Sequence, residues 1–202
     1  MELVHYNYFM KKVFVLLESL IYVSFIVFDL LKIDSTYIKY LGIVLCFLFA
    51  FFNKKKYRTI SMFFTLIADL FLLVLNKNYE VGLASFIIVQ TTYMFFEKYL
   101  DSVYFNKFIY IRFTTILVGT IILYLTSNLT LLNELVLIYF SSLLFNTIYA
   151  YSIKKIILAL GLTLFVCCDI CVGIHNINVA NNLATFLMWF FYLPSQVLIV
   201  MA

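Results

Sequence analysis

The sequence predicts an all-α integral membrane protein, a bundle of about eight transmembrane helices, and three observations support this prediction. Of the 202 residues, 65% are hydrophobic and only 12% are charged, whereas a soluble domain is nearer half apolar and a quarter charged. The apolar residues form continuous runs rather than the alternating pattern of membrane strands. With five glycines and one proline, the chain also lacks the composition of a linker-rich or disordered protein.

Eight apolar runs approach the roughly 20 residues that cross a bilayer. In chain order they are residues 13–31, 37–52, 59–75, 81–96, 108–125, 131–149, 156–174 and 183–201. The second, third and fourth runs are short and depend on flanking aromatic residues. The first run follows two lysines as a signal peptide would, but no small-residue cleavage site comes after it, so we expect a retained helix. Because the connecting segments are short, residues 1–202 are expected to form a single membrane domain.

Lysine and arginine predict how these helices are oriented. Eight spans place eleven basic residues on one side of the membrane and only three, Lys32, Lys39 and Lys77, on the other. Since basic loops face the cytoplasm, both termini are predicted to be cytoplasmic, in a multi-pass protein of a bacterial cytoplasmic membrane. The net charge of +4 comes from short clusters between apolar runs and does not indicate nucleic-acid binding. The lipid bilayer is the expected partner, and the oligomeric state is left open.

Asp69 and Asp169 carry carboxyl groups inside predicted helices, where a charged side chain costs roughly 2.5–3.5 kcal/mol. Asp69 comes six residues before the end of the third run and Asp169 five before the end of the seventh. Both helices run in the same direction, so at 1.5 Å per residue both carboxyl groups lie about 8–9 Å from the outer boundary. Equal depth allows the two acids to share one site, although the sequence does not exclude that they lie far apart laterally.

Polar side chains recur on one face of several predicted helices. Small polar residues every four positions are typical of helices that pack closely, and this recurrence predicts a central polar cavity, although interhelical hydrogen bonding explains any one of them alone. The positions are Ser61, Thr65 and Asp69; Gln90 and Tyr93; Tyr139, Ser142, Asn146 and Tyr149; and Tyr192 and Gln196. An Asp followed by a Gln in the next helix occurs in each half, which indicates a weak internal repeat of four plus four helices.

Three segments carry a family resemblance. They are residues 64–72 (FTLIADLFL) with Gly82, Phe86, Gln90 and Tyr93 after them, residues 159–165 (ALGLTLF) leading to Cys168 and Asp169, and residues 191–199 (FYLPSQVLI). In this order they resemble the YhhN family of lysoplasmalogenase-like membrane proteins, and Lys39 matches a basic residue that the family often places before a proline. The chain departs from the family pattern at Ala68 for a usual Gly, at Gln90 for a usual His and at Tyr40 for the proline. Loss of the His removes a proton carrier, which puts the activity in question.

The resemblance implies hydrolysis of the vinyl ether bond of a lysoplasmalogen, a lysophospholipid, to a fatty aldehyde and a glycerophospho head group. Protonation of the β-carbon gives an oxocarbenium ion that water captures, so the reaction needs one protonated carboxyl group and one carboxylate, and neither a metal nor another cofactor. Burial and a neighbouring carboxylate both favour a protonated acid, and Asp69 and Asp169 are the candidate pair. The resemblance places around them, to orient water and the head group, Gln90, Tyr93, Tyr192 and Gln196, with Lys39 as a point charge for the phosphate.

Other interpretations stay open. Intramembrane acids equally suit a small proton- or cation-coupled carrier, and a scaffold without a substrate would use them only to hold helices together. Cys167, Cys171 and His175 share a helical face, and residues 168–171 match a Cys-x-x-Cys pattern, but a four-ligand metal site usually pairs two such motifs. We therefore expect these cysteines to be small buried hydrophobic residues. Glu18, deep in the first run, is a further candidate acid.

Overall fold

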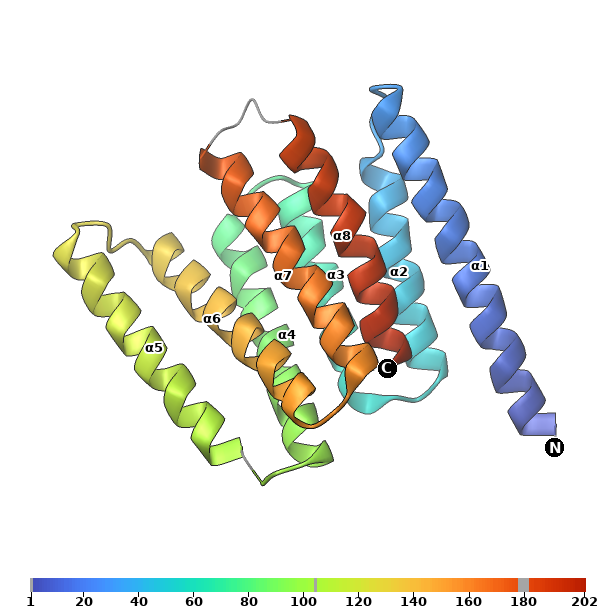
Figure 1. The fold of residues 1–202 in the computed structure, drawn as a ribbon. Coiled ribbons are helices and arrows are strands. Elements are labelled where there is room, and N and C mark those ends of the chain that lie inside the picture. Colours follow the sequence, from blue (N-terminus) through green and yellow to red (C-terminus); the bar gives the residue numbers. More distant parts are fainter. Residues whose placement is uncertain (1, 104, 178–181) are drawn as a thin grey trace.

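A computed structural model describes residues 2–103, 105–177 and 182–202, and over these residues the chain is all α. Each predicted apolar run corresponds to one helix, and a short π-helix, η1, directly follows the third (Figure 1). The elements are α1 (Glu2–Leu30), α2 (Thr36–Phe52), α3 (Lys56–Asp69), η1 (Leu70–Val74), α4 (Tyr79–Leu100), α5 (Phe105–Leu125), α6 (Leu131–Ser152), α7 (Ile156–Ile177) and α8 (Asn182–Met201). The largest difference from prediction is at α1, which begins well before residue 13.

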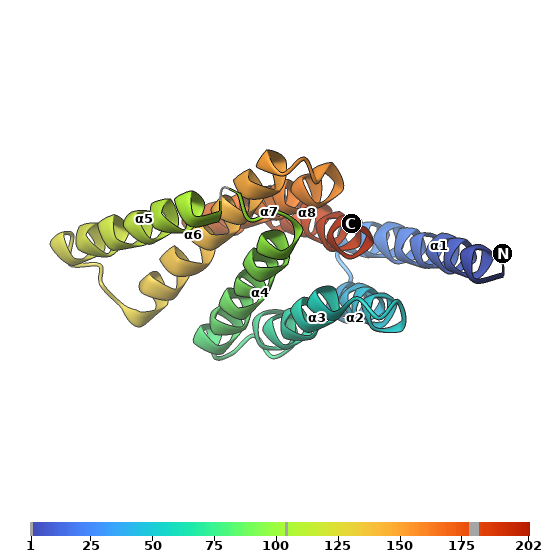
Figure 2. The ribbon, with the colours of Figure 1, turned by 90° about the horizontal axis from the view of Figure 1, so that it is seen from below.

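Six of the helices form a closed ring. Around it, α2 packs on α3, α3 on α4, α4 on α6, α6 on α7, α7 on α8, and α8 again on α2. The other two helices lie outside this ring, α1 against α2 and α8, and α5 against α6. Figure 2 shows α1 and α5 at opposite extremes of the molecule, with the ring helices between them. The ring therefore encloses the interior in which a site can be built.

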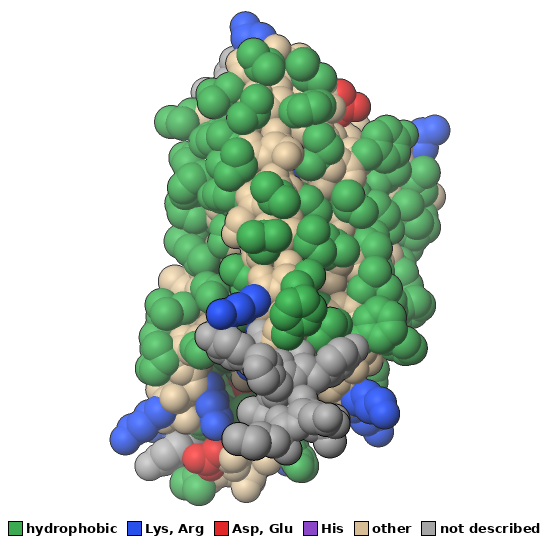
Figure 3. All heavy atoms as spheres, turned by 90° about the vertical axis from the view of Figure 1, so that its right-hand side faces the viewer, with side chains coloured by type: hydrophobic (Ala, Val, Ile, Leu, Met, Phe, Trp, Pro, Cys, Tyr) green, Lys and Arg blue, Asp and Glu red, His purple; other side chains and the backbone are tan. Residues whose placement is uncertain are grey.

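The outer surface is suited to lipid. In the view of Figure 3, hydrophobic side chains cover the middle of the molecule, and lysine and arginine gather toward its two ends. Six helical segments are long and apolar enough to cross a membrane: Phe9–Leu30, Lys56–Val74, Phe105–Leu125, Leu131–Ser152, Ile156–Asn176 and Leu183–Met201. The chain is thus a multi-pass helical membrane protein. Helix α2 is apolar but has only 17 residues, and α4 carries Glu80, Gln90 and Glu97, so a crossing by all eight helices stays a prediction.

Two turns at the same end of the bundle have the same geometry (Figure 1). Lys54 lies two residues after the end of α2 and Lys154 two residues after the end of α6, both in the left-handed conformation with φ of 54° and 57°. In each turn the amide of the next lysine donates back into the preceding helix, over 3.4 Å in the first turn and 3.0 Å in the second, which is the usual way that a left-handed residue closes a helix. We call this end of the molecule, marked by the turns at 53–55 and 153–155, the basic end.

The two halves of the chain correspond in more than these turns. The numbers of the two turns differ by 100, as do those of Asp69 and Asp169. Contacts between successive helices in the first half recur in the second, α2 with α3 as α6 with α7, and α3 with α4 as α7 with α8. These are the correspondences that a repeat of four helices would produce, and the repeat itself stays a prediction.

One of the hydrogen bonds that join α1 to the ring depends on a proline in α8. Pro194 lies inside α8 and has no N–H, so the carbonyl of Phe190 lacks its partner within the helix. The hydroxyl of Tyr22 in α1 donates to that carbonyl oxygen over 3.1 Å, and the Tyr22 ring packs on the Phe190 ring with centroids 5.9 Å apart. Helix α1 thus satisfies a backbone group that the proline leaves open.

Candidate functional site: an acid cluster inside the helix ring

Asp69 is the last residue of α3 and is buried. The hydroxyl of Tyr192 in α8 donates to Asp69 Oδ2 over 2.8 Å. Because α3 and α8 are not neighbours in the ring, this hydrogen bond crosses the ring interior. Both side chains therefore face the inside of the bundle, as the small polar stripe of the third helix predicts.

The backbone widens directly after Asp69. In η1 the amide of Leu75 donates to the carbonyl of Leu70 over 2.8 Å, one residue further back than in an α-helix. Such π-turns are rare and frequently occur at functional sites. The turn packs closely on α4, since a Cβ on Gly82 would come within 2.5 Å of the Leu72 side chain. The close approach explains why a residue without a side chain stands at position 82.

Asp169 has a matching arrangement on α7. It is half-buried, and the hydroxyl of Tyr139 in α6 donates to its Oδ2 over 2.6 Å. Each of the two acids is thus held by one tyrosine hydroxyl from another helix of the ring. Neither acid forms an ion pair with a basic residue in the described part of the chain.

The two acid–tyrosine pairs belong to one cluster. The ring of Phe165 lies 5.4 Å from the ring of Tyr192 and 6.3 Å from that of Tyr139, measured between centroids. The Tyr139 hydroxyl interacts electrostatically with Asp69 as well as with Asp169. We call these five residues, Asp69, Tyr192, Asp169, Tyr139 and Phe165, the acid cluster. It joins α3, α6, α7 and α8 inside the ring.

Lys39 lies beside this cluster but is already paired. Its Nζ is 2.8 Å from Asp29 Oδ2 in α1, and the Ser35 hydroxyl donates to the same carboxylate. The ammonium also lies over the rings of Phe25 and Trp189, 5.6 and 5.5 Å from their centroids. A phosphate at Lys39, as the resemblance implies, would have to share or displace Asp29.

Three other residues that the sequence singled out lie deeper, away from the acids. Gln90 in α4 accepts a hydrogen bond of 2.9 Å on Oε1 from Asn146 in α6, and Gln196 donates to its neighbour Ser195. Tyr93 lies near Ser61, which precedes Asp69 by eight residues, about 12 Å along α3. The structure therefore brings Tyr192 to the acids, and it places Gln90, Tyr93 and Gln196 in the middle of the bundle.

Tyr139 is not among the site residues that the sequence predicts. The signal was present, because Tyr139 stands on the polar face of the sixth predicted helix, but helical periodicity does not show which neighbour a side chain reaches. Glu18, by contrast, lies on α1 outside the ring, where the Cys46 thiol is 3.4 Å from its Oε1. It is buried but separate from the acid cluster.

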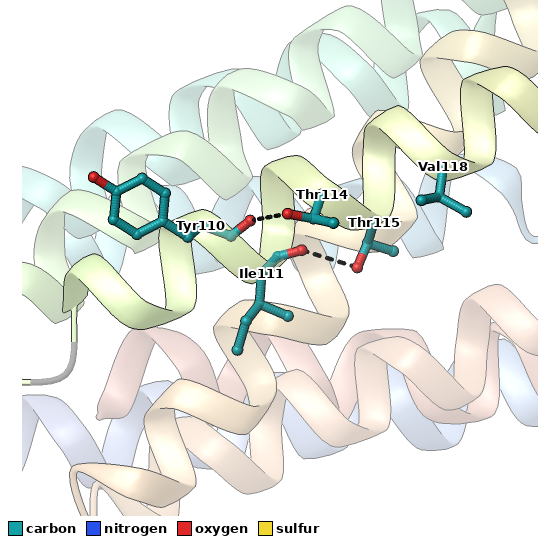
Figure 4. Close-up of a pocket in the computed structure, with 5 residues that line it drawn as sticks. All are labelled: Tyr110, Ile111, Thr114, Thr115 and Val118. Atoms are coloured by element: carbon teal, nitrogen blue, oxygen red, sulfur yellow. Dashed lines mark hydrogen bonds between the residues drawn. The ribbon is translucent and has the colours of Figure 1, made fainter.

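The other candidate sites are a metal site and a hollow on α5. In the described residues no three His, Cys, Asp or Glu side chains converge as metal ligands would. A hollow on α5 is lined by Tyr110, Ile111, Thr114, Thr115 and Val118, all from one exposed helix (Figure 4). Its threonine hydroxyls donate to carbonyls of their own helix over 2.9 Å. The hollow therefore has the character of a lipid-facing surface.

A ring of apolar helices that turns two carboxyl groups toward its interior defines a multi-pass helical membrane protein with an acid cluster inside the bundle. Within this class the chain belongs to the YhhN family, whose sequence pattern matches residues 35–202. The match takes in α2 to α8, and so the whole ring and the acid cluster, but not α1. No curated protein and no solved structure matches the chain.

Proposed function

We propose that the protein hydrolyses the vinyl ether bond of lysoplasmalogens, with Asp69 and Asp169 as its acid–base pair. The observation that carries the proposal is the acid cluster, in which two carboxyl groups, each held by one tyrosine, face a shared interior. Membership of the YhhN family is consistent with this activity. The carboxyl groups are expected to lie within about 10 Å of each other, the scale of two-carboxylate hydrolases that admit a water molecule.

The reaction needs little beyond these groups. A protonated carboxyl group transfers its proton to the β-carbon of the vinyl ether, and the second carboxylate stabilises the resulting oxocarbenium ion. That carboxylate then takes a proton from the attacking water, which gives a hemiacetal. The hemiacetal collapses to a fatty aldehyde and the free glycerol hydroxyl as this proton passes to the glycerol oxygen and the hemiacetal hydroxyl gives its own proton to the first carboxylate. The sum is one water consumed and one carbon–oxygen bond broken. An apolar interior with no basic partner is the setting that keeps one of two neighbouring carboxyl groups protonated.

The tyrosines act as positioning residues in this scheme. Each hydroxyl donates to one carboxylate oxygen and so leaves the other oxygen of that group for the substrate or water. Phe165 and Trp189 supply apolar walls next to the acids, which suits the alkenyl chain of a lysolipid and limits the access of bulk water.

Aldehyde release from purified protein tests the proposal. The full chain in detergent or nanodiscs is given a lysoplasmalogen, and a lysolipid with a saturated alkyl ether at the same position serves as the matched control. We expect aldehyde from the vinyl ether only, because the saturated ether has no carbon–carbon double bond whose β-carbon could accept a proton.

The same purified protein distinguishes a hydrolase from the competing function, a carrier. A carrier would release no aldehyde. In liposomes it would dissipate or use a proton or cation gradient, and Asp69→Asn and Asp169→Asn would each abolish this transport. Absence of aldehyde from every lysoplasmalogen, together with such transport, would replace the hydrolase with a carrier.

A further inference from the structure

The basic end of the molecule holds a cavity that the acid cluster does not use. Its volume is about 290 Å³, and it lies where α3 and α7 begin and where α4 and α8 end. Arg58, in the first turn of α3, lies on its wall and is 11 residues from Asp69, about 16 Å along the helix. The cavity is therefore separate from the acid cluster and lies toward the opposite face of the membrane.

Arg58 is a buried cation with no ion-pair partner among the described residues. Its side chain is only 6% exposed, and Nε and Nη1 have no hydrogen-bond acceptor in the described part of the chain. The guanidinium lies over the Phe96 ring, 5.4 Å from its centroid, which holds it in place without neutralising it. A buried charge of this kind is costly unless an anion binds it.

Further positive charge surrounds the same cavity. Lys154 and Lys155 lie on its wall, and neither forms an ion pair with the described residues. Burial lowers the pKa of the nearby Lys55, and the charges of Arg58 and Lys11 lower it further. Several positive charges thus repel one another around the cavity, and binding of an anion would relieve this repulsion.

The start of α7 is a third feature of the cavity that favours an anion. Residues 156–158 line the cavity. The helical hydrogen bonds of α7 begin with the amide of Ala159, which donates to the carbonyl of Lys155 over 2.8 Å. The amides of the preceding turn have no partner inside the helix. A helix N-terminus with free amides attracts anions, and here it adjoins an unpaired buried arginine.

We propose that this cavity binds a phosphate group, between the Arg58 guanidinium, Lys154, Lys155 and the first turn of α7. A guanidinium binds phosphate through two parallel hydrogen bonds. In Arg58 either Nε or Nη1, each without an acceptor in the described part of the chain, forms such a pair together with Nη2. Phe96, Leu100 and Ile157 give the cavity an apolar side, on which the carbon portion of a phosphate ester fits. The phosphate belongs either to a lipid head group of the adjacent leaflet or to a soluble phosphate, and the two sources are distinguished by experiment.

The test measures binding to the purified full chain. One arm titrates short-chain phosphatidic acid, the other inorganic phosphate against chloride at equal ionic strength, and binding is followed by native mass spectrometry and by thermal stability. We expect saturable binding in at least one arm. A response to the lipid alone assigns the site to a head group, and a response to phosphate alone assigns it to a soluble anion.

Variants locate the site. Arg58→Gln should weaken binding by roughly tenfold or more, since a hydrogen bond to a charged group contributes about 1.5–3 kcal/mol. A double variant, Lys154→Gln with Lys155→Gln, changes exposed residues only and should also weaken binding, so the test survives if Arg58→Gln does not fold. The matched control is Lys98→Gln, at the same end but over the Phe105 ring and outside the cavity. Equal affinity in all of these proteins, or no saturable binding in either arm, would overturn the proposal.

Discussion

The hydroxyl of Tyr192 donates a hydrogen bond of 2.8 Å to the carboxylate of Asp69, across the interior of a ring in which their helices are not neighbours. On the other side of Phe165, Tyr139 donates in the same way to Asp169 over 2.6 Å. The two acids therefore have the same local chemistry although different helices supply it. This parallel arrangement is what makes a shared function for the two acids more plausible than two unrelated structural contacts.

Removal of one tyrosine hydroxyl should slow hydrolysis without unfolding the protein. Tyr192→Phe and Tyr139→Phe keep the ring contacts with Phe165 and delete only the hydrogen bond to the acid. A hydrogen bond to a charged group contributes about 1.5–3 kcal/mol, so kcat is expected to fall by roughly ten- to a hundredfold. Because the hydroxyls position the acids rather than bind the lipid, KM should change little.

The control for this pair is Tyr151→Phe. The Tyr151 hydroxyl lies 3.1 Å from Thr163 Oγ1 on an exposed part of α6 and α7, outside the ring interior. Its kinetics should match the parent. Equal loss in all three variants would mean that the tyrosines act on general stability and not on the acids.

Helix α1 should be loosened by Tyr22→Phe. The change keeps the aromatic contact with Phe190 and leaves the carbonyl freed by Pro194 without a donor, so the free energy of unfolding should fall by about 0.5–1.5 kcal/mol. Thermal or denaturant unfolding in detergent measures this loss. Ser24→Ala is the matched control, because the Ser24 hydroxyl bonds only to the Leu20 carbonyl of its own helix; a similar loss there would contradict the role given to Tyr22.

Much of this architecture can be predicted from the sequence. Continuous apolar runs are so pronounced that they locate all eight helices, and the four-residue spacing of Ser61, Thr65 and Asp69 correctly predicts the inward face of α3. The equal depth of Asp69 and Asp169 along their helices, by contrast, stays a prediction. Pairing across the ring could not be predicted, because periodicity gives a direction around one helix and not the identity of its neighbours. For that reason Tyr139 was missed.

Lys39 illustrates the same limit in another way. A lone lysine near the outer boundary was interpreted as a phosphate contact, yet Asp29, ten residues earlier on a different helix, binds it over 2.8 Å. A turn between two helices brings these charges together, and neither residue alone reveals it. The cavity around Arg58 could likewise not be predicted from the sequence, since four helix ends that are distant in the sequence form it.

Orientation is predicted by the eleven-to-three distribution of basic residues. Reporter fusions after Lys56 and after Asn128 should read cytoplasmic and external respectively, because an excess of lysine and arginine is retained inside. Between these points the chain passes through α3, α4 and α5, and the readings differ when an odd number of these helices crosses, as all three do in the predicted eight-span topology. The same reading at both fusions would contradict the eight-span topology, because an even number of these three helices would then cross.

The central claim is that Asp69 and Asp169 act together as the acid–base pair. The most direct measurement is aldehyde release from a lysoplasmalogen by the parent, by Asp69→Asn, by Asp169→Asn and by the double variant, each confirmed to insert and fold. Asn keeps the size of the side chain and removes its acid–base capacity, so each single variant should lose about 10²–10⁴-fold in rate, and the double variant should lose little more because the two act as one unit. A folded single variant that keeps the parent rate, or losses that multiply in the double variant, would contradict the account.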